Sequence, residues 1–185
     1  MDFQFKKRHA LLSIGIGILI LAPIVMIILP KYIVEYLYLY NSQTAMFVLL
    51  PSGTRILYLI AFVLSGVAFI LMSLWKNKKM LGVGLASLLL SIILLFFSTL
   101  PYISIGYDGI HFREVLSVKE HRYQWEDIEE VLRYSDYNGP GFYGYEVIFH
   151  DGKKLRLADN KDFNHARGMF LKGIRGLELE IKVID

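Results

Sequence analysis

The chain of 185 residues contains no cysteine. Without thiols it can build neither a disulfide scaffold nor a thiolate metal site, and it has no cysteine nucleophile. Its five histidines do not stand in the H-x-x-x-H or H-E-x-x-H spacing that marks a zinc site. The sequence therefore predicts no metal site and no cofactor. The alternative is a zinc site formed if His111 and His150 approach one another across strands.

Charge is also scarce, since Asp, Glu, Lys and Arg make up 20% of the chain and the mean hydropathy is +0.44. Three long runs, residues 10–29, 56–75 and 80–100, contain no charged residue or histidine. Each is long enough to cross a hydrocarbon core of ~30 Å as a helix. Intramembrane charges mark most proton and ion pathways. The sequence therefore predicts an all-α membrane region over residues 1–100 with three transmembrane helices, and it disfavours a pump, an ion-coupled transporter or a channel.

Residues 31–54, between the first two spans, are rich in tyrosine. Tyrosine favours the headgroup zone of a bilayer, and Glu35 with the polar residues 41–44 disfavours a fourth span over residues 31–52. We interpret the segment as an interfacial loop. Its side chains Tyr36, Tyr38 and Tyr40 are candidate contacts to lipid or to a partner. A loop that only rests on the bilayer is the alternative.

Basic residues cluster at the ends of the predicted spans. Residues 6–8 are all basic and precede a first span that lacks a small-x-small cleavage site, which indicates an uncleaved anchor with a cytoplasmic N-terminus. Lys76, Lys78 and Lys79 lie in the link between the second and third spans and belong on the same side. Three spans then place residues 101–185 outside the cell membrane, whereas a fourth span would bring them inside.

The net charge of +3 combines two opposite halves. Residues 1–100 hold eight Lys and Arg against two acids, and residues 101–185 hold twelve against fifteen. The basic excess therefore marks helix ends and gives no support for an anionic ligand. Nucleic-acid binding is excluded as well, since the second half offers neither a basic face nor a reading helix.

The pattern of the second half changes to period two, which predicts strands. Apolar residues alternate over residues 103–112 and 145–157, and Asp151-Gly152 predicts a two-residue hairpin turn. A helix follows with Asp159 or Asn160 as its cap, and residues 177–183 complete the set as a last strand. We expect an α+β domain over residues 101–185, with an antiparallel sheet covered by one helix.

Short motifs in this half carry a resemblance to a known family. They are Tyr107-Asp108-Gly109-Ile110, Tyr123-Gln124-Trp125-Glu126-Asp127-Ile128 with Val131, and the hairpin from Val147 to Leu157. The segment resembles the bacterial pleckstrin-homology-like (PH-like) domains of small membrane proteins. The resemblance implies a curved, barrel-like antiparallel sheet closed by a helix, with extra strands over residues 113–118 and 128–137. It also implies a non-enzymatic role, which some relatives fill as immunity proteins against membrane-acting peptides and others as accessory proteins. Many relatives carry the domain in the cytoplasm, contrary to the charge pattern.

Three further groups of residues are candidate sites. The acidic run Glu126, Asp127, Glu129 and Glu130 points in several directions, so a solvated face is favoured over acid–base catalysis, and Asp127 suits a turn. The glycine-rich loop 135–144 lacks the Gly-Lys-Ser/Thr ending of a phosphate loop. Its aromatic residues are candidate contacts to lipid or partner: Tyr137, Phe142 and Tyr143. A basic hairpin could attract anionic headgroups: Lys153, Lys154 and Arg156.

From these features we expect a non-enzymatic integral membrane protein that presents a PH-like interaction domain at the membrane surface. Its expected partners are the lipid bilayer and another membrane protein or peptide. One alternative is immunity against a membrane-active peptide. Another is a membrane enzyme or transporter accessory with a site at the surface.

Overall fold

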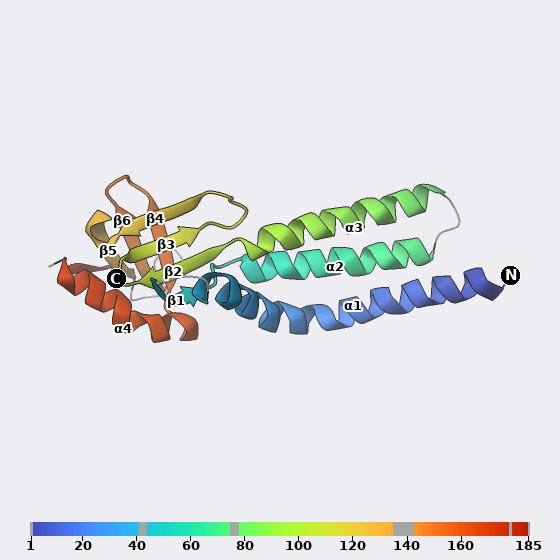
Figure 1. The fold of residues 1–185 in the computed structure, drawn as a ribbon, viewed down its shortest axis with the longest axis horizontal. Coiled ribbons are helices and arrows are strands. Elements are labelled where there is room, and N and C mark those ends of the chain that lie inside the picture. Colours follow the sequence, from blue (N-terminus) through green and yellow to red (C-terminus); the bar gives the residue numbers. More distant parts are fainter. Residues whose placement is uncertain (1, 41–43, 75–77, 135–142, 178, 185) are drawn as a thin grey trace. The chain divides into compact units, whose positions relative to one another are not determined.

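The computed structural model describes residues 2–40, 44–74, 78–134, 143–177 and 179–184 (Figure 1). The chain divides into two compact units. The helical unit comprises Met1–Ile33, Gly53–Pro101 and Val115–Ser117. The α/β unit comprises Val34–Ser52, Tyr102–Glu114 and Val118–Asp185. Residues 34–52 therefore belong with the α/β unit, although the sequence predicted a single boundary near residue 100.

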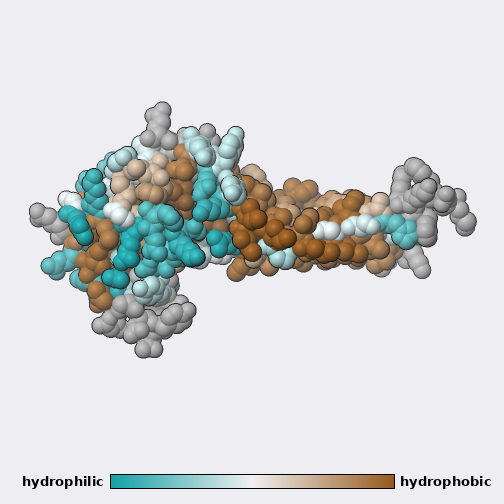
Figure 2. All heavy atoms as spheres, turned by 90° about the horizontal axis from the view of Figure 1, so that it is seen from below, coloured by the Kyte–Doolittle hydropathy of each residue, from teal (hydrophilic) through white to brown (hydrophobic). Residues whose placement is uncertain are grey.

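The helical unit consists of three long helices, α1 (Asp2–Val34), α2 (Thr54–Ser73) and α3 (Lys78–Thr99). Three stretches are long and apolar enough to cross a membrane: Arg8–Leu39, Thr54–Ser73 and Lys79–Thr99. Large apolar side chains such as Ile20, Ile27 and Leu89 are more than 60% exposed, and hydrophobic residues dominate the face of these helices seen in Figure 2. Three helices of this kind indicate a membrane protein, as the sequence predicted.

Small residues let these helices approach closely. A Cβ atom on Gly15 of α1 would lie 2.8 Å from the carbonyl oxygen of Gly66 in α2. A Cβ on Gly84 of α3 would lie 2.5 Å from the side chain of Met72 in α2. The Ser91 hydroxyl of α3 donates a 2.8 Å hydrogen bond to the carbonyl of Ala61. Gly15, Gly84 and Ser91 therefore serve contacts within this chain, as close packing in lipid requires.

The α/β unit contains two four-stranded sheets. The first sheet is antiparallel throughout, in the order β1 (Ala45–Leu49), β2 (Tyr102–Gly106), β3 (Gly109–Arg113), β4 (Glu120–Gln124). The second has the order β7 (Lys154–Ala158), β6 (Gly144–Phe149), β5 (Ile128–Tyr134), β8 (Ile181–Ile184). One helix, α4 (Lys161–Gly176), precedes β8. The predicted α+β class is thus confirmed at the level of a four-stranded antiparallel sheet plus a helix.

The predicted loop over residues 31–54 is wrong in two places. The first helix does not end at Leu29 but continues through Pro30 to Val34, followed by the π-helical turn η1 (Glu35–Leu39). Residues 45–49 then form β1, because Phe47 and Leu49 pack against the hydrophobic core of the α/β unit. β1 pairs with β2, so its partner lies more than fifty residues away in the sequence.

Other details of the predicted sheet are also corrected. β8 pairs with β5 in parallel, whereas an entirely antiparallel sheet was expected. Residues 114–119 contain a turn and no strand. The predicted two-residue turn is a three-residue loop, since the Phe149 amide donates to the Lys153 carbonyl and Gly152 (φ 80°) is the residue with positive φ in that loop.

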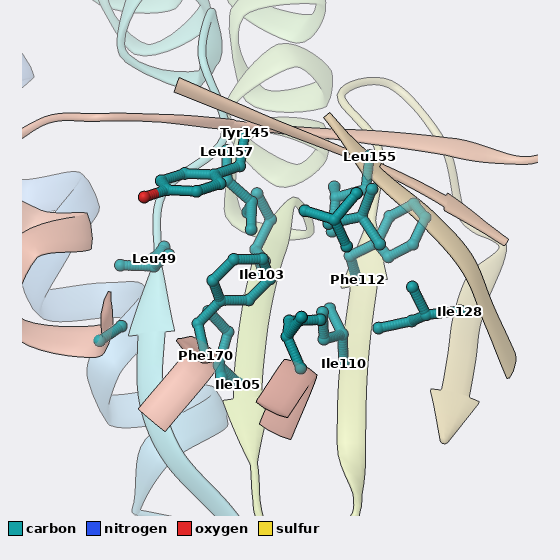
Figure 3. Close-up of a cluster of buried hydrophobic side chains, with 14 of the residues drawn as sticks. Leu49, Ile103, Ile105, Ile110, Phe112, Ile128, Tyr145, Leu155, Leu157 and Phe170 are labelled. Carbon is teal, nitrogen blue, oxygen red and sulfur yellow. The ribbon is translucent and has the colours of Figure 1, made fainter. Parts of the chain in front are cut away.

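One hydrophobic core joins both sheets and α4 (Figure 3). Ile105 and Phe112 enter it from the first sheet, Tyr145 and Leu157 from the second, and Phe170 from α4. These inward residues occupy every second strand position, which is the alternation visible in the sequence.

Local hydrogen bonds fix the elements around this core. Asn160 caps α4 by accepting a 2.9 Å bond from the Phe163 amide, which confirms one of the two predicted caps. The short 3₁₀ helix η2 (Trp125–Asp127) follows β4, and Asp127 Oδ2 accepts a 2.7 Å bond from the Gln124 amide. The interpretation of Asp127 as a turn residue is therefore confirmed.

Candidate binding pocket on the first sheet

The outward face of the first sheet carries two rows of polar side chains. Because side chains alternate along a strand, the neighbours of the inward residues Ile103 and Phe112 point away from the core. The strand register places them in two rows across β2, β3 and β4. The first row is Tyr102, Arg113 and Glu120, and the second row is Ser104, His111 and Arg122.

The turn η1 lies over the first row. The ring of Tyr38 stacks on the ring of Tyr102, with centroids 3.9 Å apart and an interplanar angle of 14°. The Tyr38 hydroxyl accepts a 3.3 Å hydrogen bond from Nη1 of Arg113. Tyr38 thus contacts the sheet, while Tyr36 and Tyr40 are 68% and 79% exposed. The candidate tyrosines therefore divide between a pocket residue and two surface residues.

Glu120 lies at the β4 end of the first row and is the acceptor to which its neighbours donate. Its Oε1 accepts hydrogen bonds from the Tyr102 hydroxyl at 2.7 Å and from Arg122 Nε at 2.8 Å, and its Oε2 lies 3.4 Å from Arg113 Nη2. Burial alone would raise the pKa of Glu120, but the hydrogen bonds from Arg122 and Tyr102 outweigh it and hold that pKa below its ordinary value. Burial and then the bond to Glu120 raise the pKa of Tyr102 well above its ordinary value. Near neutral pH, Glu120 is therefore ionised and Tyr102 is neutral.

This geometry predicts a pH-dependent loss of stability that Glu120→Gln reduces. A carboxylate with a lowered pKa in the folded state stabilises the fold above its unfolded pKa, and that contribution is lost as the pH falls through the lowered folded value. We expect Glu120→Gln to lower the free energy of unfolding by about 2 kcal/mol at pH 7. It should also flatten the fall in that free energy as the pH drops below the ordinary pKa of a glutamate and through the lowered folded value. Denaturation of the full chain in detergent micelles over a pH series measures both.

Glu114→Gln is the matched control, because Glu114 pairs with Lys153 at 2.9 Å and its side chain is 48% exposed. An exposed ion pair contributes about 1 kcal/mol or less. Equal pH slopes for Glu120→Gln and the wild-type chain would contradict the role given to Glu120.

Next to the two rows lies a pocket of about 440 Å³, a size typical of sites for small ligands. Its lining comprises Leu37, Tyr38, Thr44, Tyr102, Ser104, Asp108, His111, Glu120 and Arg122. Ser104 is 5% exposed, whereas the Arg122 side chain is 71% exposed. His111 Nε2 lies 3.6 Å from Asp108 Oδ2. The second row therefore runs from a buried serine to an exposed guanidinium, with a carboxylate beside it.

The basic hairpin lies on the second sheet, and each of its three basic side chains has an acidic partner. Lys153 pairs with Glu114 at 2.9 Å. Lys154 and Arg156 lie 3.6 Å and 2.7 Å from the carboxylate of Glu146, which is only 3% exposed. The hairpin charges are thus largely compensated within the unit, which weakens their attraction for anionic headgroups.

The remaining candidate aromatic residues lie at the glycine-rich loop. Tyr143 precedes β6, is 41% exposed and accepts a backbone hydrogen bond from Asp159. Tyr137 and Phe142 lie outside the described residues. Neither Tyr143 nor the basic hairpin lines the pocket described above.

The histidines and the acidic run show ring stacking and solvent exposure in the described part of the chain. No group of three metal-ligating side chains occurs among the described residues, so His111 and His150 are not joined in such a site there. The ring of His121 stacks on Phe112 at 5.1 Å. In the acidic run, Glu126 and Glu129 are exposed, as a solvated face predicts.

Sequence reasoning missed most of the pocket. The available signal was that four outward positions of two neighbouring strands carry polar groups: Tyr102, Ser104, His111 and Arg113. The sequence did not show which residues of β4 stand opposite, nor that Tyr38 covers the first row. The pocket arises from register and from a contact between distant segments.

No protein-family model matches the chain, and no curated protein or solved structure is significantly similar to it.

Proposed function

We propose that this chain is a non-enzymatic integral membrane protein whose α/β unit is an interaction module held at the membrane surface, in a regulatory or accessory role. The observation that carries the proposal is the pocket on the first sheet. One carboxylate of its lining, that of Glu120, already accepts hydrogen bonds from three side chains, those of Tyr102, Arg113 and Arg122. Such a group orders the neighbouring side chains for binding.

The electrostatics of the first row support binding over acid–base chemistry. An efficient general acid or base needs a pKa near the working pH. The pKa of Glu120 is lowered and that of Tyr102 is raised, so both move away from neutrality. His111 beside Asp108 favours the second candidate, a membrane enzyme or transporter accessory with a surface site.

A PH-like architecture is part of the proposal. The resemblance implies an antiparallel barrel-like sheet closed by a helix, and β2 to β7 followed by α4 form one shared core. Trp125 of the recognised motif supports the closure, because its ring contacts α4 where Gly173 leaves room for it. Its indole also donates a 3.1 Å bond to the Tyr107 carbonyl.

Exposed tyrosines support a partner or lipid contact next to this unit. Tyr36 and Tyr40 are 68% and 79% exposed and lie four residues apart, which places this short row along one side of the turn η1. Tyrosines in such a row suit a membrane interface or a protein contact. In the immunity variant of the proposal, this row would meet the membrane-active peptide.

Photo-crosslinking in intact cells tests the proposal. A photoreactive residue at position 40 should give one discrete protein or peptide adduct, and a His111→Ala background should retain it. The control position is Ile24, which is 53% exposed in the apolar stretch and should give lipid adducts only. The same adducts from both positions would contradict an interaction module, and loss of the adduct in His111→Ala would favour a chemical site.

The orientation is a separate part of the proposal. We place the N-terminus in the cytoplasm and the α/β unit outside, from the distribution of Lys and Arg. A C-terminal reporter that is active only outside the cytoplasm should be active. An inactive reporter, together with an active cytoplasmic one, would reverse this orientation.

A further inference from the structure

The second row of the pocket contains hydrogen-bond donors that make no hydrogen bond to the described residues. Ser104 is 5% exposed and lines the pocket, and its hydroxyl has no hydrogen-bond partner among the described residues. Arg122 donates its Nε to Glu120, and within the described part of the chain its two terminal nitrogens make no hydrogen bond. The Ser104 hydroxyl is thus free to donate a hydrogen bond to a ligand in the pocket. The Ser104 hydroxyl and the Arg122 guanidinium are both suited to donate hydrogen bonds to an acidic group of a ligand.

The charges around the pocket are balanced. Arg113 and Arg122 supply two positive charges, and Glu120 and Asp108 supply two negative charges. Glu120 is committed to the two arginines and to Tyr102, whereas the Asp108 side chain is 41% exposed and lines the pocket beside His111. A ligand with an acidic group alone would meet the Asp108 carboxylate at an energetic cost. A ligand that also carries an ammonium group would pair with it.

Resting on the function proposed above, we infer that this pocket binds a small zwitterion, with its acidic group on Arg122 and Ser104 and its ammonium group on Asp108. The phosphoethanolamine headgroup of a membrane lipid has this chemistry, and a free zwitterion would offer it as well. The sequence favours the lipid as the source. Leu37 and Tyr38 line the pocket and also belong to the apolar stretch Arg8–Leu39, which is long enough to cross a membrane.

The test uses the full chain in nanodiscs of phosphatidylcholine that contain one tenth phosphatidylethanolamine or one tenth phosphatidylglycerol. Native mass spectrometry of the released protein counts the retained lipids. Relative to its share of the nanodisc lipid, phosphatidylethanolamine should be retained about tenfold more than phosphatidylcholine or phosphatidylglycerol. Phosphatidylcholine has the same phosphate but a trimethylammonium that cannot donate a hydrogen bond, and phosphatidylglycerol has no ammonium.

Two pocket variants and one matched control locate the site. Arg122→Ala and Asp108→Asn should each reduce retention of phosphatidylethanolamine about tenfold. Lys182→Ala removes a cation of the second sheet that is 69% exposed and also pairs with a glutamate, Glu130, and it should leave retention unchanged. Circular dichroism of each variant verifies the fold. Unchanged retention in folded Arg122→Ala and Asp108→Asn would overturn the pocket as the site.

Free O-phosphoethanolamine, titrated by calorimetry into the chain in detergent, distinguishes the two sources. Binding of this probe with the same dependence on Arg122, but without lipid selectivity in nanodiscs, would uphold zwitterion binding and overturn the lipid source. Equal retention of the three lipids and no binding of the free probe would overturn the inference altogether. A discrete crosslink from position 40 would still stand in that case, so the proposed interaction module can survive the failure of this inference.

Discussion

Replacing Gly109 by alanine is expected to destabilise the α/β unit by about 3 kcal/mol or more. Gly109 has φ of 150°, a conformation that residues with a side chain rarely adopt. A Cβ atom there would lie 2.0 Å from the carbonyl oxygen of Tyr123 and 2.8 Å from the Cα of Gln124. Both are backbone atoms of β4, which pairs with β3 at this point, so neither can move without breaking the ladder.

Gly152→Ala is the matched control for Gly109→Ala. Gly152 also has positive φ, at 80°, but a Cβ atom on it would meet no atom within 4 Å. Its substitution should cost about 1 kcal/mol from backbone conformation alone. Thermal or chemical denaturation of both variants in detergent micelles measures the difference. Equal losses of unfolding free energy in the two variants would mean that the close approach of β3 to β4 does not exclude a side chain at position 109.

Gly109→Ala also bears on the pocket, because the same turn holds Asp108. The motif Tyr107-Asp108-Gly109 was recognisable in the sequence as a turn. The requirement for glycine at its end was not, since it comes from the β4 backbone about fifteen residues later. A local motif therefore predicted the turn, and a long-range contact explains why it tolerates no side chain.

The same distinction separates the predictable from the unpredictable parts of the fold. The three apolar runs and the cap of α4 depend on neighbouring residues, so the sequence alone could predict them. β1 could not be recognised in this way. Its residues 45–49 follow a tyrosine-rich segment and precede a span, and only pairing with β2 makes them a strand. Strand pairing at this separation leaves no local pattern.

The pocket was missed for a related reason. Period two showed which residues of β2 and β3 point outward, but it could not show which partner stands opposite each of them. The triad of Tyr102, Arg113 and Glu120 exists only through the register of three strands. Tyr38, which covers this triad, comes from η1, 75 residues before Arg113 in the chain. The net charge of residues 101–185 gave no sign of this site, because the positive charge of Arg113 and the negative charge of Glu120 cancel in the sum.

Replacing Gly15 by leucine is expected to disrupt the contact between α1 and α2, at a cost of about 3 kcal/mol. A Cβ atom at this position would lie 2.8 Å from the carbonyl oxygen of Gly66 and 2.8 Å from the side chain of Ile70. In lipid, packing of this kind is the main attraction between helices, because the surrounding tails are as apolar as leucine. The variant should therefore lose helix packing although its hydropathy rises.

Gly17→Leu separates this packing effect from a change in hydropathy, because it adds the same side chain two residues further along α1. A Cβ atom on Gly17 would meet nothing within 4 Å. We expect Gly17→Leu to unfold at nearly the wild-type temperature in detergent micelles, and Gly15→Leu to unfold well below it. Hydrogen exchange should be faster across α1 and α2 in Gly15→Leu alone. If both variants unfold at the wild-type temperature, the Gly15–Gly66 crossing does not hold the helices together.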